Sequence, residues 1–374
     1  LFLFAPLLFA WTGYLLLRRL SNNRWLIAGA SLLYAISPVA ISAVNSGRIS
    51  TVVALILLPL LIIAAQGIFE IDQFSWRRIF GISLLSSVLF AFSPILLLIG
   101  LLLNCFAIYR DYSASESGVN AELFNQRLYR RIAIVATPFL ICAPWSFELL
   151  TQPKRFFIDS GFLISGGGPN LALLGNPGGP GSLPIYIVSP LVLLLAISLF
   201  SSTKARFVAE LGFILLLFAI LLSTISLTGH GSSIPTQIYV GSILALTTIA
   251  AIAASVIMLD KLRERLIETN INFRHISAAI LLVVTALYSV TSIAWMVSSG
   301  ANSPLQTGKG EVLPAFLAVE SDAKTIVIRQ RMIDEEVTLN YYIARGSDIT
   351  LGQPDLAPAN RLQISSAVQE IADG

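Results

Sequence analysis

Long apolar runs, separated by short turns that contain arginine, dominate the first 300 residues of the chain. A helix needs about 20 apolar residues to cross a bilayer. Ten segments approach that length, namely 1–17, 25–44, 49–67, 79–92, 94–109, 132–149, 185–202, 207–227, 237–259 and 276–298. The sequence therefore predicts an all-α polytopic membrane protein with about ten transmembrane helices, integral to the plasma membrane and multi-pass.

The charged residues divide the chain into two parts. Only 12% of the residues are charged, against about 25% in soluble domains. Of the 24 basic and 21 acidic side chains, 16 fall within residues 301–374. This contrast predicts a transmembrane helical region at 1–300 and a small polar domain at 301–374. The net charge of +3 is too small to indicate a nucleic-acid partner.

Residues 301–374 are predicted to form a small α/β module. The segments 324–330 and 337–345 alternate apolar and polar residues as strands do. Residues 331–336 are predicted as the polar turn between them, and 311–322 and 360–373 as helices. Two strands alone are marginally stable, so we expect the module to continue beyond Gly374.

The segment 79–109 is either one very long helix or two short helices that break at Ser93-Pro94, since proline disfavours a helical preceding residue. Lys and Arg of short loops concentrate on the cytoplasmic side, and two helices give by far the stronger bias. They place three basic residues outside before residue 300 (Arg48, Lys154 and Arg155) and fifteen inside. This orientation puts the C-terminal module outside the cytoplasm.

The chain starts inside an apolar run, with Leu1 in place of a methionine and with no basic stretch before it. A secretory signal peptide needs such a basic start. We therefore expect the chain to be a fragment that begins partway through a longer membrane protein.

Residues 166–184, GGGPNLALLGNPGGPGSLP, are rich in glycine and proline. Phosphate-binding glycine loops join a strand to a helix and carry a lysine or a G-x-G-x-x-G pattern, and this stretch has neither. The predicted topology also places it outside, where nucleotides are absent. We interpret it as a turn-rich external loop, and the alternative is a lid over an outward-facing cavity.

Five charged side chains on the predicted outer side are candidates for binding a lipid phosphate or a glycan, because ionisable residues near membrane spans are costly. They are Arg48, Glu148, Lys154, Arg155 and Asp159. In one interpretation they bind the phosphate or pyrophosphate of a lipid carrier, with Glu148 as a base or positioning group. In the other, the basic side chains extend to lipid headgroups and Glu148 pairs with one of them. No catalytic residue, cofactor site or metal site is evident.

Several short motifs, taken in order, resemble the multi-spanning portion of actinobacterial membrane proteins of the family 2 glycosyltransferases. The matching stretches are Arg18-Arg19-Leu20, 34–38, Ser46-Gly47-Arg48, 57–60, 91–94, 144–150, 176–184 and 312–320. In that family a cytoplasmic nucleotide-sugar transferase domain with an acidic metal-binding motif lies upstream. The resemblance therefore implies a glycosyltransferase as the whole protein, with a divalent metal in the upstream domain.

Three functions remain open from the sequence. The first is the membrane portion of a cell-envelope glycosyltransferase that handles a lipid-linked sugar or glycan, such as a polyprenyl-phosphate sugar. The second is a polytopic transporter or flippase for lipid-linked glycans without transferase chemistry. The third is a scaffold whose external module binds a partner or a wall polymer. Transporters bury charges in mid-span and show internal repeats, whereas nearly all charges here fall at span ends, which favours the first.

Overall fold

The computed structural model describes residues 2–66, 76–115, 121–157, 166–179, 181–228, 235–267, 273–300, 324–333 and 336–345. Its contacts divide the chain into two units. The first comprises Leu1–Leu227 and Thr236–Leu305, and the second comprises Thr228–Pro235 and Gln306–Gly374. Each unit is described by itself below.

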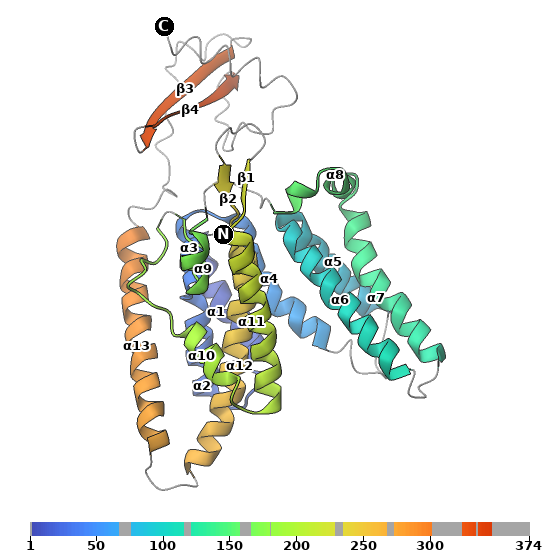
Figure 1. Cartoon of the computed structure of the whole chain (residues 1–374), viewed down its shortest axis with the longest axis vertical. Helices are drawn as coiled ribbons and strands as arrows, with labels where there is room; N and C mark the ends of the chain where they lie inside the picture. The colour runs from blue at the N-terminus through green and yellow to red at the C-terminus, as the bar shows by residue number, and fades with distance from the viewer. Residues whose placement is uncertain are drawn as a thin grey trace. The chain divides into compact units, whose positions relative to one another are not determined.

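The first unit is helical, as Figure 1 shows. Its longer helices are α1 (Ala5–Leu17), α2 (Arg24–Ala35), α4 (Ile49–Gln66), α5 (Trp76–Phe92), α6 (Pro94–Ser115), α7 (Ala121–Ile141), α11 (Thr203–Ser223), α12 (Gly241–Ile267) and α13 (Phe273–Gly300). Its shorter ones are η1 (Phe2–Phe4), α3 (Pro38–Asn45), α8 (Trp145–Thr151), η2 (Pro153–Phe157), α9 (Gly168–Leu173) and α10 (Leu191–Ser198).

Within the described residues, four helices are long and apolar enough to cross a membrane: α4, α11, α12 and α13. Two bent pairs, α2 with α3 and α7 with α8, raise the number to six if each pair is one span. The apolar segments Phe2–Leu17 and Pro94–Tyr109 are shorter. The chain is thus mostly helical with several apolar helices that could span a membrane, and ten spans stay a prediction.

The predicted span 25–44 is broken in two. Helix α2 ends at Ala35, α3 begins at Pro38, and the two axes differ by 42°. Proline lacks the N–H that would continue the ladder, and the Ser37 side chain instead accepts a hydrogen bond from Ala40 N. The hydroxyl of Tyr288, in α13, donates over 2.9 Å to the carbonyl of Ile36, the buried residue that follows the end of α2.

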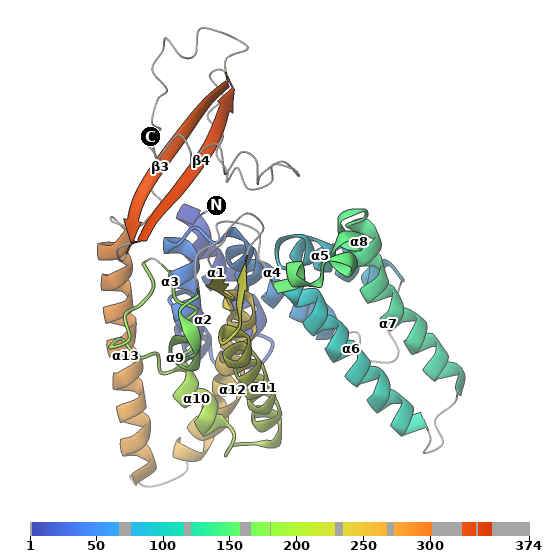
Figure 2. The same ribbon diagram turned by 45° about the horizontal axis from the view of Figure 1, so that its top comes forward.

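Segment 79–109 is two helices, as the distribution of charge predicted. Helix α5 ends at Phe92 and α6 begins at Pro94, with Ser93 fully buried between them. Figures 1 and 2 both show α5 and α6 side by side.

The bounds of two predicted spans are wrong. The span predicted at 185–202 contains only the eight-residue helix α10, because Pro184 and Pro190 cannot continue an N–H ladder. The span predicted at 132–149 begins earlier, at Ala121, and bends by 100° between α7 and α8. Arg131 precedes the predicted span, yet it lies inside α7 and is 7% exposed. Leucine and arginine are good helix formers, so the helix continues past the apolar stretch.

Helix α12 lies at the centre of the first unit. Of its span Gly241–Arg263, 83% is buried, against 11% of the span Ala279–Ser298 in α13. Small residues allow this close packing, and a Cβ on Gly212 of α11 would lie 3.1 Å from the Cβ of Ala250. Figures 1 and 2 both show α11 beside α12.

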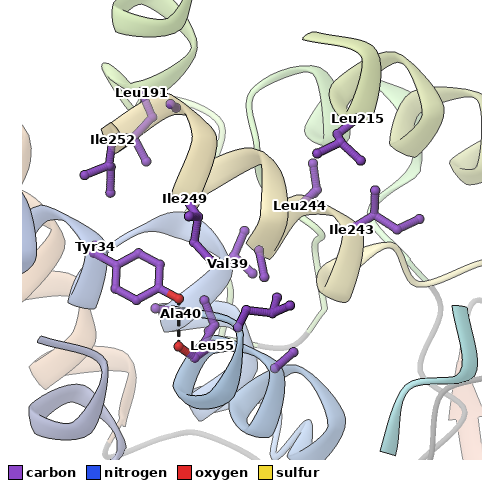
Figure 3. Packing of buried hydrophobic residues seen from close by; sticks show 14 of the residues in the cluster. Tyr34, Val39, Ala40, Leu55, Leu191, Leu215, Ile243, Leu244, Ile249 and Ile252 are labelled. Carbon is purple, nitrogen blue, oxygen red and sulfur yellow. Dashed lines mark hydrogen bonds between the residues drawn. The ribbon is translucent and has the colours of Figure 1, made fainter. Parts of the chain in front are cut away.

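A hydrogen bond from Tyr34 repairs the helical ladder where proline interrupts it in α4. Pro59 lies within α4, so the carbonyl of Leu55, four residues earlier, lacks its helical donor. The buried hydroxyl of Tyr34 donates to that carbonyl over 2.7 Å (Figure 3). Gly13 makes room for the ring, because a Cβ there would lie 2.9 Å from Cδ1 of Tyr34.

Several exposed basic residues in or beside the connections between helices lie at one end of the first unit. The α1–α2 and α10–α11 connections and the end of α12 lie at the lower end in Figure 1. Their exposed basic side chains are Arg18, Arg19, Arg24, Lys204, Arg206, Lys261 and Arg263. The α3–α4 turn and α9 lie at the opposite end, which agrees with the segregation of charge that the sequence predicts.

The second unit contains an antiparallel hairpin of β3 (Lys324–Ile333) and β4 (Glu336–Arg345), in which Lys324 pairs with Arg345 and Ile333 with Glu336. Both strands were predicted, but they are longer than predicted, so the turn is shorter than 331–336. The helices predicted at 311–322 and 360–373 lie outside the described residues. A separate short ribbon pairs β1 (Ser226–Thr228) with β2 (Pro235–Gln237), and most of its residues belong to the first unit.

Candidate functional site

Arg48 lies in a tight turn between α3 and α4, as predicted. Its backbone N–H donates to Ala43 O over 2.9 Å, and α4 begins at the next residue. The side chain is only 3% exposed. It is therefore buried within the protein and does not reach outward, as an arginine that extends to lipid headgroups must.

The guanidinium of Arg48 stacks on the ring of Tyr239, which lies two residues before Gly241, the first residue of α12. Its Cζ lies 4.3 Å from the ring centroid, and Tyr239 is 8% exposed. A cation–π contact of this kind contributes about 2 kcal/mol when both groups are desolvated. Stacking occupies a face of the guanidinium plane, whereas its N–H groups donate from the edge. The contact thus orients a buried positive charge at the ends of α3, α4 and α12.

The glycine-rich loop is folded onto this same end of the bundle. Ser42 of α3 donates to the carbonyl of Gly178, and Nδ2 of Asn45 donates to the carbonyl of Gly181 over 2.9 Å. From the opposite side, Nε1 of Trp295 in α13 donates to the carbonyl of Ser182 over 3.1 Å. The loop is therefore attached to α3 and α13 by side-chain hydrogen bonds to its backbone.

Packing explains why the loop contains glycine. Gly178 has φ of +76°, and a Cβ on it would lie 2.3 Å from the Cα of Gly167. Gly181 has φ of +74°, and its Cβ would lie 2.7 Å from the Cβ of Asn45. L-residues rarely adopt such φ values, and two backbone segments touch only where both lack side chains. Gly178 thus lets the loop pack against the backbone of Gly167, and Gly181 lets it pack on α3, which accounts for these glycines without a nucleotide.

Thr51, in the first turn of α4, also faces this region. Its side chain is fully buried, and its Oγ1 has no hydrogen-bond partner among the residues that the structure describes. That oxygen lies 2.8 Å from the position that a Cβ would take on Gly241, the first residue of α12. The first turns of α4 and α12 therefore meet at Thr51, next to the stacked Arg48.

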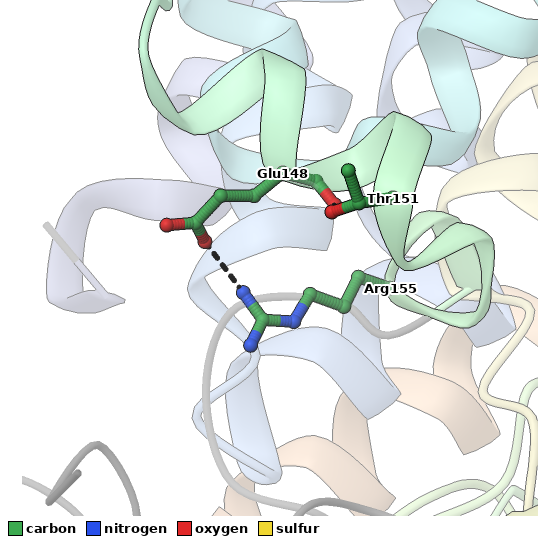
Figure 4. Close-up of polar contacts among 3 residues, drawn as sticks. All are labelled: Glu148, Thr151 and Arg155. Carbon is green, nitrogen blue, oxygen red and sulfur yellow. Dashed lines mark hydrogen bonds and ion pairs between the residues drawn. The ribbon is translucent and has the colours of Figure 1, made fainter. Parts of the chain in front are cut away.

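Glu148 and Arg155 form an ion pair with each other (Figure 4). Nη1 of Arg155 lies 2.7 Å from Oε2 of Glu148, and the side chains are 34% and 58% exposed, respectively. Helix α8 and the following 3₁₀ helix η2 bring the two residues together across the chain reversal at Gln152. The prediction that Glu148 pairs with one of the nearby basic residues is confirmed.

The remaining two candidates differ from these. Lys154 is exposed on η2, and Asp159 lies outside the described residues. The structure thus brings Glu148 and Arg155 together, whereas Arg48 stacks on Tyr239.

The sequence analysis did not identify four residues around Arg48: Ser42, Asn45, Thr51 and Tyr239. One signal was present, because Ser42, Asn45 and Ser46 recur at helical spacing within an otherwise apolar α3 and so share a face. Tyr239 lies in an apolar run far along the chain, and nothing in its neighbourhood marks it as a partner of Arg48.

The described part of the chain contains no group of three His, Cys, Asp or Glu side chains placed to hold a metal ion. Comparison of the chain with protein-family models, with curated proteins and with solved structures gives no match. The resemblance to glycosyltransferase-like membrane proteins therefore stays a prediction.

Proposed function

We propose that this chain is the membrane portion of a cell-envelope glycosyltransferase that handles a lipid-linked sugar or glycan. In this proposal the chain crosses the membrane about ten times and carries an extracytoplasmic α/β module at 301–374. Membrane lipids and a polyprenyl-phosphate-linked sugar or a cell-wall glycan are its partners. Any divalent metal belongs to an upstream transferase domain.

One observation carries the proposal: Arg48 is buried at the end of the helices opposite the basic turns, beside the docked glycine-rich loop. A buried arginine is costly unless it serves an anion or a specific structure. Lipid-linked sugars carry a phosphate or pyrophosphate at the membrane surface, and the guanidinium fork matches phosphate oxygens. Arg48 therefore has both the chemistry and the position to recognise such a substrate.

The ion pair of Glu148 and Arg155 has a smaller part in this proposal. Each side chain already has an oppositely charged partner and is partly solvated, so neither is available as a buried anion-binding group. We assign the pair to holding α8 against η2.

Glycan transfer by the full-length protein in membrane vesicles, supplied with a labelled polyprenyl-phosphate sugar, tests the assignment. Arg48→Lys keeps the positive charge but removes the planar guanidinium, whose paired N–H groups match two phosphate oxygens. Hydrogen bonds to charged groups contribute about 1.5–3 kcal/mol each. We expect transfer to fall about tenfold or more, while the double variant Glu148→Gln/Arg155→Gln stays within about twofold. Normal transfer by Arg48→Lys at equal expression would remove Arg48 from the site.

The broken pair α2 and α3 specifically favours a second candidate, a flippase or transporter for lipid-linked glycans. Discontinuous helices commonly form transporter sites, and the 42° break lies in the pair that leads to Arg48. A flippase moves a fluorescent lipid-linked sugar between leaflets of liposomes and forms no new glycosidic bond. Arg48-dependent movement without a glycosylated product favours the flippase, and a glycosylated product favours the transferase.

A further inference from the structure

We propose that the first turns of α4 and α12 together form one binding site for a phosphate group, with Arg48 and Thr51 as its side-chain donors. The inference rests on the proposed function only for the source of the phosphate, which there is a lipid-linked sugar. It adds a second helix and a hydroxyl donor to the role proposed for Arg48.

The helix ends supply the first part of the site. The first N–H groups of a helix have no intrahelical acceptor, and the helix dipole places partial positive charge there. Neither α4 nor α12 has an acidic residue in its first turn. Arg48 adds a full positive charge directly before α4, although a cation at that end opposes the dipole. Two helix starts and an arginine at one point favour a multiply charged anion.

Thr51 supplies independent evidence for a ligand. Several buried hydroxyls within the helices donate to the carbonyl four residues earlier, as Thr12, Ser83 and Ser255 do over 3.0, 2.9 and 2.6 Å. Ser292 in α13 shares with Thr51 a buried hydroxyl that has no partner among the described residues, but only Thr51 lies at a helix start. Thr51 is fully buried, yet its Oγ1 has no such partner in the described structure and faces the start of α12. An unsatisfied buried hydroxyl costs about 1–3 kcal/mol, and a phosphate oxygen that takes the place of the Tyr239 ring beside the two helix starts satisfies it.

The ring of Tyr239 covers the site in this structure. It stacks on Arg48 and lies 2.3 Å, at Cε1, from where a Cβ would stand on Gly241. Ser42 donates its only hydroxyl hydrogen to Gly178 O, so the 3.3 Å contact between Ser42 and Tyr239 has Tyr239 as donor. Phosphate enters when this ring moves aside, a movement that breaks the stacking on Arg48 and the 3.3 Å contact with Ser42.

The experiment measures binding to the full-length protein in nanodiscs by thermophoresis. The probes are polyprenyl monophosphate and uncharged polyprenol in the nanodisc, and inorganic phosphate and pyrophosphate in solution. We expect the phosphorylated lipid to bind at least about tenfold more tightly than polyprenol, because only it presents the charged oxygens. The soluble anions could bind instead, with the same dependence on Arg48 and Thr51. The site then binds free phosphate, and the inference that Arg48 and Thr51 bind a phosphate group is still supported.

Thr51→Val and Thr12→Val make the same change at two buried positions. Thr51→Val removes a hydroxyl with no partner among the described residues, so it leaves the melting temperature unchanged or higher and weakens phosphate binding about tenfold. Thr12→Val removes a hydrogen bond within α1, so it lowers the melting temperature and leaves binding unchanged. Arg48→Lys weakens phosphate binding by a similar factor to Thr51→Val.

Three results overturn the inference: equal affinity for polyprenol and its phosphate, phosphate binding that neither Thr51→Val nor Arg48→Lys alters, or a loss of stability in Thr51→Val without a loss of binding. These results leave the glycosyltransferase proposal standing if transfer still depends on Arg48. Conversely, if phosphate binds as described but the full-length protein transfers no sugar, the glycosyltransferase proposal is wrong and the phosphate-binding site is retained.

Discussion

Removing the hydroxyl of Tyr34 tests how the broken helical ladder of α4 is stabilised. Pro59 has no N–H, so the carbonyl of Leu55 depends on the 2.7 Å hydrogen bond from Tyr34. Tyr34→Phe keeps the ring, which fits against Gly13, and removes only the donor. The carbonyl of Leu55 is then left in the core with its helical partner already missing.

The expected loss of stability in Tyr34→Phe depends on the burial of the Leu55 carbonyl and on the absence of an N–H at Pro59. Tyr34 is 2% exposed and Leu55 is fully buried, so water does not replace the lost hydroxyl. An unsatisfied buried polar group costs about 1–3 kcal/mol, whereas hydrogen bonds between membrane helices average about 0.6 and reach about 1.7 kcal/mol. We expect Tyr34→Phe to lower the free energy of unfolding by about 1.5 kcal/mol, near the top of the membrane range.

A double-mutant cycle with Pro59→Ala isolates the cause. Alanine at position 59 restores the N–H that donates to Leu55 O. In that background Tyr34→Phe leaves no carbonyl unpaired, so we expect it to cost about 0.5 kcal/mol, the lower end of the net contribution of a hydrogen bond. The coupling energy is therefore about 1 kcal/mol by this reasoning. Equilibrium unfolding in mixed micelles of mild detergent and dodecyl sulfate, followed by tryptophan fluorescence, measures all four variants.

Tyr186→Phe is the matched control, because Tyr186 is 74% exposed; we expect a change within about 0.5 kcal/mol. An equal cost of Tyr34→Phe with proline or alanine at position 59 refutes the reasoning. It would mean that the Tyr34 hydroxyl does not compensate for the missing N–H.

Three further substitutions test the loop and the ion pair. Gly181→Ala places a Cβ against Asn45 at a positive φ, so we expect thermal unfolding to show a loss of stability of about 2 kcal/mol or more. An unchanged stability would mean that the loop does not pack against Asn45. Trp295→Phe removes the indole N–H that donates to the loop, and we expect this to lower the stability by about 1 kcal/mol. Cleavage of the loop by a protease of broad specificity should then become faster. Unchanged cleavage argues against this attachment. Glu148→Gln breaks the partly solvated pair with Arg155 and should cost under about 1 kcal/mol in the same melting assay, so a larger loss contradicts the structural role assigned to the pair.

The sequence predicted the helical membrane-like character of the chain and the split at Ser93, because hydropathy and the placement of arginine are properties of segments. It failed where a helix continues past its apolar stretch, as at Arg131, or where prolines prevent a helix in an apolar stretch, as before α10. The strands of the C-terminal hairpin were predicted from alternation, but their ends were not, since pairing extends them to Ile333 and Glu336.

Sequence by itself determined that Arg48 stands in a turn between apolar segments, because the Ser-Gly pair before it interrupts the helical pattern. It also determined that Glu148 lies close enough along the chain to Arg155 for an ion pair. Only the tertiary structure decided that Arg48 is buried, because its neighbour Tyr239 is 191 positions away in the numbering. The same holds for Gly181, which packs against Asn45 of α3, and for Thr51, whose hydroxyl is buried without a partner in the described structure where α12 packs against α4. Long-range packing sets burial, and burial decides whether a charge or a hydroxyl is a solvated surface group or part of a site.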